Sequence, residues 1–479
     1  MKRSLALAGP VILFAFLAST TLRADDTFVH FESGPVRPLA LSPVGSHLFA
    51  ANIPDNRVEI FEIDRNGGLR SVGEVVVGLE PVAIAARDEN ELWVVNHLSD
   101  SVSVVDVSDP TRPFVKATAL VGDEPRDIVI AGVERDLVFI TTAHRGQNGA
   151  RDPELTTPGV GRADVWIFDA NDPSSPIEVL TLFCDTPRAL AVSPDRTRVY
   201  AASFFSGNRT SVLTAIAAAS DSSANLLIDD GFSAPGMPPP LQSDDGVPAP
   251  DVGVIVRFDD ESGKWLDSIG RDWTPRMRFN LPDKDVFTID ATADPPREIG
   301  FATGVGTTIF NLAVHPVSGK VYASNLDARN IVRFEPGVRG HVAESRVTII
   351  DPETGEVSPV HINPHIDFDA PVSPPSVVEE SLAFPLEMAF EPDGEAFWVA
   401  AFGSSAIGLF DADGGRIARV SVGGGPSGLA RHPLTNRLYV LNRFDHTISI
   451  VDTAARQEIA VTPLRYNPEP EPIRVGRPL

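Results

Sequence analysis

Two histidines in one short segment are the most suggestive metal-binding residues of this chain. His361 and His365 lie in His361-Ile-Asn-Pro-His365, and neutral imidazoles are common ligands of zinc and other transition metals. Asp367 and Asp369 follow, but no cysteine completes a recognisable ligand set. The pattern therefore leaves two interpretations open: a metal site at His361 and His365, or a loop in which both side chains only form hydrogen bonds.

A cluster of basic residues stands out in a chain that is acidic overall. It comprises Arg329, Arg333, Arg339, His341 and Arg346. Guanidinium groups bind carboxylates through two parallel hydrogen bonds, which makes such a cluster a candidate site for an anion or a protein partner. The alternative is a solvated loop whose charges are neutralised by local ion pairs.

Several motifs of common chemistries are absent from the sequence. It contains no Cys-x-x-Cys-His for covalent haem, no Gly-x-Ser-x-Gly, no Walker loop and no His-Glu-x-x-His. Cys184 is the only cysteine, so no intrachain disulfide can form. No catalytic residues can be assigned from the sequence, and no cofactor is expected within this chain.

The composition describes a globular chain that is large enough for an extensive core. It has 479 residues, 43% of them hydrophobic, and a formal net charge of −25. This charge argues against nucleic-acid binding. The 42 prolines are expected in turns and loops, because proline cannot donate to a strand ladder.

The elements that would position these residues come from a repeat. The phrase Leu92-Trp-Val-Val-Asn96, followed by Ser101 to Asp106, returns as Leu438-Tyr-Val-Leu-Asn442, followed by Thr447 to Asp452. A period of roughly 40–50 residues with about four short strands per unit is typical of a β-propeller. Seven equivalent positions precede the first strand of each unit: Val36, Pro81, Pro125, Pro187, Ile309, Pro385 and Pro426. We therefore expect an all-β protein, a single seven-bladed β-propeller.

Long insertions fall in consecutive units. Segments near 143–162, 204–251 and 326–344 separate second and third strands, and segments near 271–308 and 360–383 follow fourth strands. In an antiparallel blade these two kinds of connection leave on the same face. The pattern therefore predicts long loop insertions on one face of the propeller, over the third to fifth blades, and long loops of this kind often carry function.

Both ends of the chain differ from the repeats. Lys2 and Arg3 precede an apolar stretch, Leu5 to Leu17, and Ala24 is a plausible cleavage point, so residues 1–24 are expected to be a signal peptide. Residues 25–464 form the expected propeller, with Thr27 to Phe31 as a strand that could complete the last blade. The proline-rich residues 465–479 predict an extended C-terminal linker or tail. No membrane span is expected after cleavage.

The blade phrase resembles the YVTN family of β-propeller repeats, which occurs in secreted and surface proteins of bacteria and archaea. Four segments are further similar to bacterial propellers fused to a C-terminal cytochrome c-type domain: 361–367, 401–405, 439–445 and 466–470. This resemblance implies a bacterial periplasmic or cell-surface location. It also implies haem c on a downstream domain or on a protein partner, because this chain carries no haem motif.

These observations favour a monomeric, exported binding scaffold that docks a cytochrome c-like domain or partner through its insertion-bearing face, with the basic cluster as the contact. Two alternatives stay open. One is a propeller enzyme, of the lyase or lactonase type, that uses the axial funnel. The other is a cell-surface interaction or adhesion module.

Overall fold

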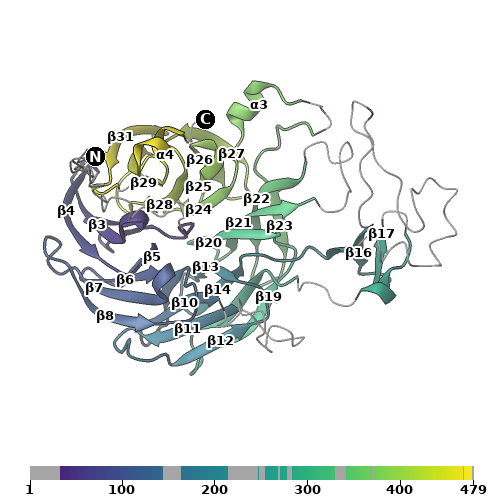
Figure 1. The fold of residues 1–479 in the computed structure, drawn as a ribbon, viewed down its shortest axis with the longest axis horizontal. Helices are drawn as coiled ribbons and strands as arrows, with labels where there is room; N and C mark the ends of the chain where they lie inside the picture. The colour runs from purple at the N-terminus through teal and green to yellow at the C-terminus, as the bar shows by residue number, and fades with distance from the viewer. Residues whose placement is uncertain are drawn as a thin grey trace, which may run out of the picture.

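The structure, a computed structural model, describes residues 33–143, 163–213, 246, 254–267, 270–277, 283–329, 341–368, 370, 372–467 and 469–476. The expected all-β architecture is confirmed. Within these ranges the α-helices are two short ones, α3 (Pro375–Glu380) and α4 (Glu471–Gly476). No helix of the described ranges is long and apolar enough to span a bilayer. Figure 1 shows the strands arranged in sheets around a common centre, as in a β-propeller.

Seven antiparallel sheets of four strands make up the ring of the described chain, and we number them in chain order. Sheets 1 to 4 are β1 (Leu39–Leu41), β2 (His47–Asn52), β3 (Arg57–Ile63), β4 (Leu69–Val76); β5 (Pro81–Ala86), β6 (Glu91–Asn96), β7 (Ser101–Asp106), β8 (Phe114–Leu120); β9 (Ile128–Ala131), β10 (Leu137–Ala143), β11 (Ala163–Asp169), β12 (Glu178–Leu182); and β13 (Pro187–Val192), β14 (Arg198–Ser203), β18 (Val286–Asp290), β19 (Arg297–Ala302). Sheets 5 to 7 are β20 (Thr308–Val314), β21 (Val321–Ala328), β22 (Ala343–Ile350), β23 (Val357–His361); β24 (Pro385–Phe390), β25 (Ala396–Ala401), β26 (Ala406–Asp411), β27 (Arg416–Ser421); and β28 (Pro426–Arg431), β29 (Arg437–Asn442), β30 (Thr447–Asp452), β31 (Gln457–Pro463).

The sheets pack against one another through apolar clusters that each join two neighbours. Trp93 of sheet 2, for example, is buried in the same cluster as Phe168 of sheet 3. The cluster that contains Leu48 of sheet 1 also contains Tyr439 of sheet 7, so the last sheet packs against the first. The first strands β1, β5, β9, β13, β20, β24 and β28 contact each other in this order, and β28 also contacts β1. Because burial of one large apolar side chain contributes about 1.5–3 kcal/mol, these clusters stabilise the ring as a closed unit.

One face of the ring is defined by recurring backbone contacts. Glu80 and Phe384, each just before a first strand, have φ of 52° and 54°. Their carbonyls accept hydrogen bonds from the N–H groups of His97 and Phe402, which directly follow second strands, at 2.9 and 3.1 Å. Connections from second to third strands and from fourth to first strands therefore lie together. We call this side of the ring the insertion face.

The fourth sheet corrects the sequence-based prediction. The predicted insertions at 204–251 and 271–308 would make residues 254–267 the third and fourth strands of sheet 4. In the structure those places are taken by β18 and β19, because β14 pairs with β18, and β18 pairs with β19. β15 (Thr210–Leu213), β16 (Val254–Asp259) and β17 (Lys264–Asp267) form a separate three-stranded sheet, whose strands β16 and β17 project beyond the ring in Figure 1. Val256, Trp265 and Trp273 build a core of their own there, so these strands bury their apolar side chains without sheet 4.

The long connections within the described ranges remain on the insertion face. Residues 204–285 form one connection between the second and third strands of sheet 4, and residues 362–384 link sheet 5 to sheet 6. The connection between β21 and β22 is described only at its ends, and residues 144–162 lie outside the described part. Opposite-face turns such as 193–197 and 432–436 are short.

The C-terminal tail returns to sheet 1. Arg465 donates its backbone N–H to both carboxylate oxygens of Glu59, at 3.1 and 2.8 Å, and the Tyr466 hydroxyl donates to Glu74 Oε1 at 2.6 Å. The expectation of an extended linker over 465–479 is wrong for α4, where a glutamate and a proline at the first positions favour a helix N-terminus. The predicted strand Thr27–Phe31 and the signal peptide lie outside the described residues, and sheet 7 has a fourth strand of its own, β31.

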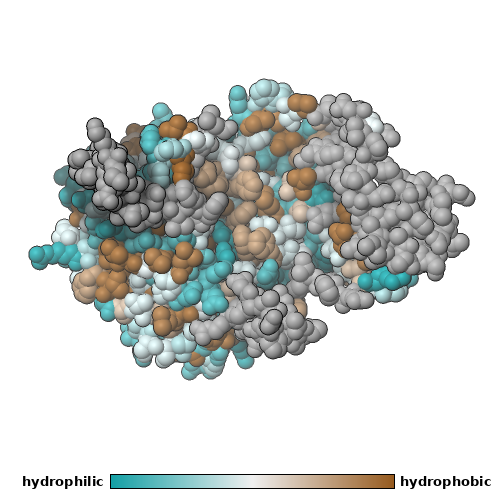
Figure 2. Space-filling view, viewed as in Figure 1, coloured by the Kyte–Doolittle hydropathy of each residue, from teal (hydrophilic) through white to brown (hydrophobic). Residues whose placement is uncertain are grey.

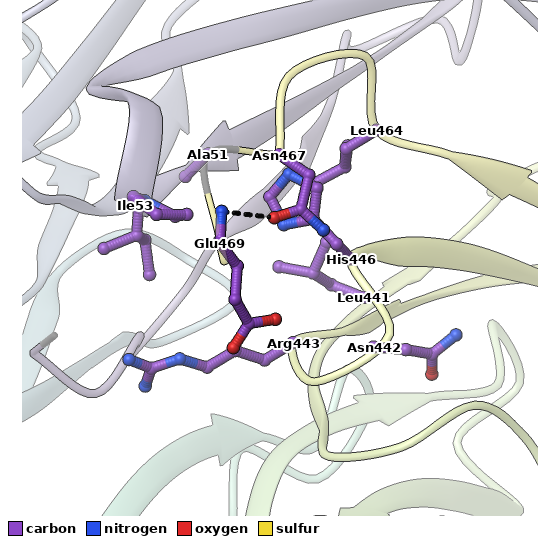
Figure 3. A pocket seen from close by; sticks show the side chains of 10 residues that line it. Ala51, Ile53, Leu441, Asn442, Arg443, His446, Leu464, Asn467 and Glu469 are labelled. Carbon is purple, nitrogen blue, oxygen red and sulfur yellow. Dashed lines mark hydrogen bonds between the residues drawn. The ribbon is translucent and has the colours of Figure 1, made fainter. Parts of the chain in front are cut away.

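Figure 3 shows how the tail lies against sheet 7. Asn467 and Glu469 face Leu441 and Arg443, with Ile53, which directly follows β2 of sheet 1, on the other side. The space between them is about 20 Å³, which is room for a single water molecule. The tail therefore fills the junction between the last and first sheets instead of leaving a ligand site there.

Hydrophobic residues on the surface shown in Figure 2 gather in several small patches with hydrophilic residues between them. This mixture agrees with the high net charge of the chain. No single binding region stands out on the face shown in Figure 2.

Candidate functional site

An arginine crosses the centre of the ring. Arg37, just before β1, donates Nε to Asp127 Oδ1 (3.3 Å) and Nη2 to Asp127 Oδ2 (3.2 Å). Its Nη2 also donates to the carbonyl of Leu190 (2.9 Å), and Nη1 donates to Glu387 Oε1 (3.4 Å). One side chain thus ties sheet 1 to sheets 3, 4 and 6. We call Arg37, Asp127 and Glu387 the axial plug.

The two carboxyl groups of the axial plug are buried, Arg37 is partly buried, and the charges compensate each other. Asp127 is fully buried and accepts further hydrogen bonds from the N–H groups of Ile128 (2.9 Å) and Leu190 (2.8 Å). Burial raises the pKa of Glu387 to about 8, although Arg37 acts in the opposite direction. Glu387 is therefore mainly protonated at pH 7, and the remaining charges of Arg37 and Asp127 cancel.

A cavity of about 590 Å³ extends from the axial plug toward the face opposite the insertions. Arg37 and Glu387 lie at its inner end, and Glu391 and Arg431 line it where the first strands end. Its walls are the first strands themselves, with mainly apolar residues: Leu39, Leu41, Ile84, Ile128, Ile130, Val192, Leu312, Val314, Met388, Phe390 and Leu429. The ring centre is thus a funnel with a mixed polar and apolar lining and a polar floor.

A second pair of arginines lies on the other side of the axial plug, at the insertion end of the first strands. Arg188, the second residue of β13, donates Nε to the Phe310 carbonyl and Nη2 to the Pro35 carbonyl, both at 2.9 Å. Its guanidinium lies 4.8 Å from the centroid of the Phe204 ring, and that of Arg126 lies 5.6 Å from the same ring. We call Arg126, Arg188 and Phe204 the arginine mouth.

Arg188 of the arginine mouth has no ion-pair partner among the described residues. Burial and the neighbouring Arg126 and Arg443 together lower the pKa of Arg188 to about 9, although Asp127 acts in the opposite direction. Arg126 pairs with Glu124 (3.1 Å), but its buried Nε has no hydrogen-bond partner in the described structure. No carboxylate of the described residues pairs with Arg188, and Asp127, which acts on it electrostatically, is held by Arg37.

Aromatic side chains continue from the arginine mouth across the insertion face. Phe204 contacts Phe205 (4.2 Å between ring centroids) and Phe310 (6.1 Å), and Phe310 contacts Phe384 (6.4 Å). Phe205 and Phe384 are 49% and 48% exposed. The centre of the insertion face therefore combines buried cations with half-exposed aromatic rings.

The predicted basic cluster is only partly described, and the described part is neutralised. Arg333 and Arg339 lie outside the described residues. Arg329, His341 and Arg346 all approach Glu344, at 3.3, 2.9 and 2.7 Å. Arg346 also pairs with Asp327 at 3.0 Å. The structure thus brings these three residues together around Glu344. The two arginines are ion-paired, and burial lowers the pKa of His341, which favours its neutral form.

The two histidines of the predicted metal site do not form a ligand set. His365 Nε2 lies 3.3 Å from the Val377 carbonyl and 3.2 Å from Ser381 Oγ. His361 contacts the ring of Phe368 instead (5.8 Å), and burial lowers its pKa. In the described ranges no group of three or more histidine, cysteine or acidic residues is arranged to hold a metal ion.

The sequence contained a signal for the central residues. Arg37, Arg126 and Arg188 each directly follow one of the seven repeat positions, Val36, Pro125 and Pro187. Asp127, Asn311 and Glu387 stand two residues after such positions, where other repeats carry proline, alanine or glycine. Comparison of the repeats at these two positions would have identified the residues that face the ring centre.

Comparisons with known proteins support the fold. The sequence matches no protein-family model and no curated protein. Among solved structures, hydrazine synthase from Kuenenia stuttgartiensis is 18% identical with a TM-score of 0.57, over 89% of this chain and 98% of that chain. A proposed 6-phosphogluconolactonase from Bacteroides uniformis (13% identical, TM-score 0.47, 83% and 88% of the chains) and AztD from Citrobacter koseri (10%, 0.41, 90% and 87%) also match. At these identities the likeness concerns the β-propeller fold alone.

Proposed function

We propose that this chain is an exported seven-bladed β-propeller that acts as a binding scaffold and receives a partner protein on its insertion face. The seven four-stranded sheets and the contact between β28 and β1 support the number of blades. The signal-like residues 1–24 support export to the periplasm or cell surface.

The observation that carries the proposal is the unequal elaboration of the two faces. Residues 204–285 and 362–384 are long connections on the insertion face, while the described opposite-face turns are short. Long connections on a rigid scaffold are the usual place for recognition. The half-exposed rings of Phe205 and Phe384 on the same face supply an apolar contact area of the kind that is enriched at interfaces.

We propose a cytochrome c-type domain as the partner. The resemblance of segments 361–367 and 439–445 to propellers fused to such domains supports this choice. The predicted contact residues Arg329, Arg333, Arg339, His341 and Arg346 remain candidates for this contact. Because three of them share Glu344, we expect their contribution to be smaller than that of the central aromatic residues.

The test compares single substitutions on the two faces. Purified chain is titrated with a c-type cytochrome domain encoded beside its gene, using calorimetry. We expect Phe205→Asp and Phe384→Asp to weaken binding at least tenfold, and Leu434→Asp, an 81% exposed position on the opposite face, to leave it unchanged. If the substitutions on both faces weaken the affinity equally, or if none of the three changes the affinity, the insertion face is not the docking surface.

A second candidate function is supported by the axial cavity. Glu387, which is mainly protonated at pH 7 because its pKa is raised to about 8, lies on the floor of the 590 Å³ funnel and could donate a proton to a bound substrate. This would fit a propeller enzyme of the lactonase or lyase type. Hydrolysis of a simple δ-lactone by the native chain, and its loss in Glu387→Gln, would support the enzyme; no hydrolysis above that of buffer would remove this alternative for lactones.

A further inference from the structure

Arg188 is a buried cation without a counter-ion. Only 5% of its surface is exposed, and its two described hydrogen bonds go to backbone carbonyls. A guanidinium stays charged in proteins, so the energetic cost of burying its charge is not relieved by loss of a proton. An isolated buried charge costs several kcal/mol unless an opposite charge approaches it.

The surroundings make this charge more costly. Arg126 and Arg443 both repel Arg188. With Glu387 mainly protonated, Asp127 compensates the charge of Arg37, and Glu124 and Asp185 act on Arg126. No carboxylate of the described residues pairs with Arg188, within a protein whose net charge is −25.

The arginine mouth also has unused hydrogen-bond donors. A guanidinium offers five N–H groups, and Arg188 uses Nε and Nη2 while Nη1 donates to no acceptor of the described residues. The buried Nε of Arg126 is likewise without an acceptor. A planar anion with two oxygens would match such forked donors and supply the missing charge.

We propose that the arginine mouth binds a carboxylate group, through Arg188 with support from Arg126 beside the Phe204 ring. The inference rests on the proposed function, since the carboxylate would belong to whatever docks on the insertion face. The carboxylate is favoured over an inorganic anion because the aromatic rings of Phe204 and Phe205 offer apolar contact to the carbon atoms that carry it.

The experiment titrates succinate into the full chain by calorimetry, in a buffer without other carboxylates. We expect saturable binding that Arg188→Gln and Arg126→Gln each weaken about tenfold or more, the amount expected for loss of a charged hydrogen bond. Arg188→Lys should weaken it less, because it keeps the charge and loses the fork. The matched control is Arg87→Gln, since Arg87 is paired with Glu91 and Asp136 toward the opposite face; it should bind as the native chain does.

Further measurements distinguish the possible sources of the anion and test the anion site separately from the docking surface. Tighter binding of phosphate than of succinate would overturn the carboxylate assignment, and so would equal binding by native chain and Arg188→Gln. If Arg188→Gln does not fold, Arg126→Gln and Arg188→Lys decide the outcome. Inhibition of cytochrome binding by succinate would indicate that the partner supplies the carboxylate, and independent binding would indicate a free ligand. Absence of saturable succinate binding to the native chain, with partner binding that still depends on Phe205 and Phe384, would refute the anion site and leave the docking proposal standing.

Discussion

Arg37 and Asp127 are joined by two hydrogen bonds, Nε to Oδ1 at 3.3 Å and Nη2 to Oδ2 at 3.2 Å, although they belong to sheets 1 and 3, which are not neighbours in the ring. Asp127 is fully buried, so this pair is a contact across the ring centre and not a surface ion pair. Arg188, on the insertion side, lacks such a partner in the described structure. Replacement by a neutral residue should therefore destabilise the protein strongly at Arg37 and only slightly at Arg188.

Arg37→Met should destabilise the protein by about 3–5 kcal/mol, because it leaves the buried charge of Asp127 without its counter-ion. Arg188→Met should change the free energy of unfolding by no more than about 1 kcal/mol, because the lost hydrogen bonds to Phe310 and Pro35 are offset by removal of an uncompensated charge. Urea unfolding measures both. A larger loss in Arg188→Met than in Arg37→Met would contradict this assignment of partners.

Glu387→Gln should reduce the pH dependence of stability. An unfolded glutamate titrates near 4.3, whereas Glu387 in the fold has a pKa of about 8. At pH values between these two, the unfolded chain has released a proton that the folded chain keeps. The contribution of Glu387 to the free energy of unfolding is therefore fully present below about pH 4 and is lost as the pH rises toward 8. Thermal unfolding from pH 4.5 to 8 should show a smaller decline in the variant.

Asp285 should also make the protein less stable as the pH rises, since burial raises its pKa to about 7. Part of the decline should therefore persist in Glu387→Gln and diminish further in the double variant with Asp285→Asn. A pH profile of Glu387→Gln that coincides with the native profile would mean that Glu387 is already ionised in the fold.

Removal of the tail after Leu464 should destabilise the ring by about 1–3 kcal/mol. It deletes the hydrogen bonds of Arg465 and Tyr466 to sheet 1 and the contact of Arg57 with the Tyr466 ring (4.5 Å). Truncation after Glu469 keeps these contacts and should behave as the full chain does. Equal stability of both truncations, measured by urea unfolding, would show that the tail does not stabilise the junction of sheets 1 and 7.

Replacement of residues 208–282 by a short glycine-serine linker should leave the ring folded. The ends of this connection are already adjacent, since Ser203 donates its N–H to the Asp285 carbonyl at 2.8 Å and Ser206 bonds to the Asp285 carboxylate. The three-stranded sheet has its own core around Trp265 and Trp273. A native-like melting temperature is expected, and a collapse of the ring would mean that residues 254–267 support sheet 4 after all.

The repeats predicted most of the ring because each repeat carries its own strands. The apolar phrase that ends in Asn96 or Asn442 appears as second strands β6 and β29, and the small-residue strands after the seven repeat positions appear as first strands. Buried Asn96 and Asn442 donate to serines of the third strand, at 3.0 and 2.7 Å, which explains why the phrase ends in asparagine. In these strands the pattern of the sequence and the packing of the side chains agree.

The fourth sheet could not be predicted in the same way. Residues 254–267 and 286–302 both have strand patterns, and the sequence does not say which pair will join β14. The choice depends on a core that includes Trp273, which follows the last of the three strands of the smaller sheet. The arginine mouth was also missed, because its residues come from segments that are distant in the sequence and only the closed ring brings them together.

Hydrogen exchange of the full chain, with and without the cytochrome c-type domain, shows directly which face of the ring receives the partner. We expect slower exchange on binding in insertion-face connections such as 402–405 and 443–446, and unchanged exchange in the opposite-face turns 391–395 and 432–436 of the same sheets. Slower exchange in the opposite-face turns, with the insertion face unchanged, would refute docking on the insertion face.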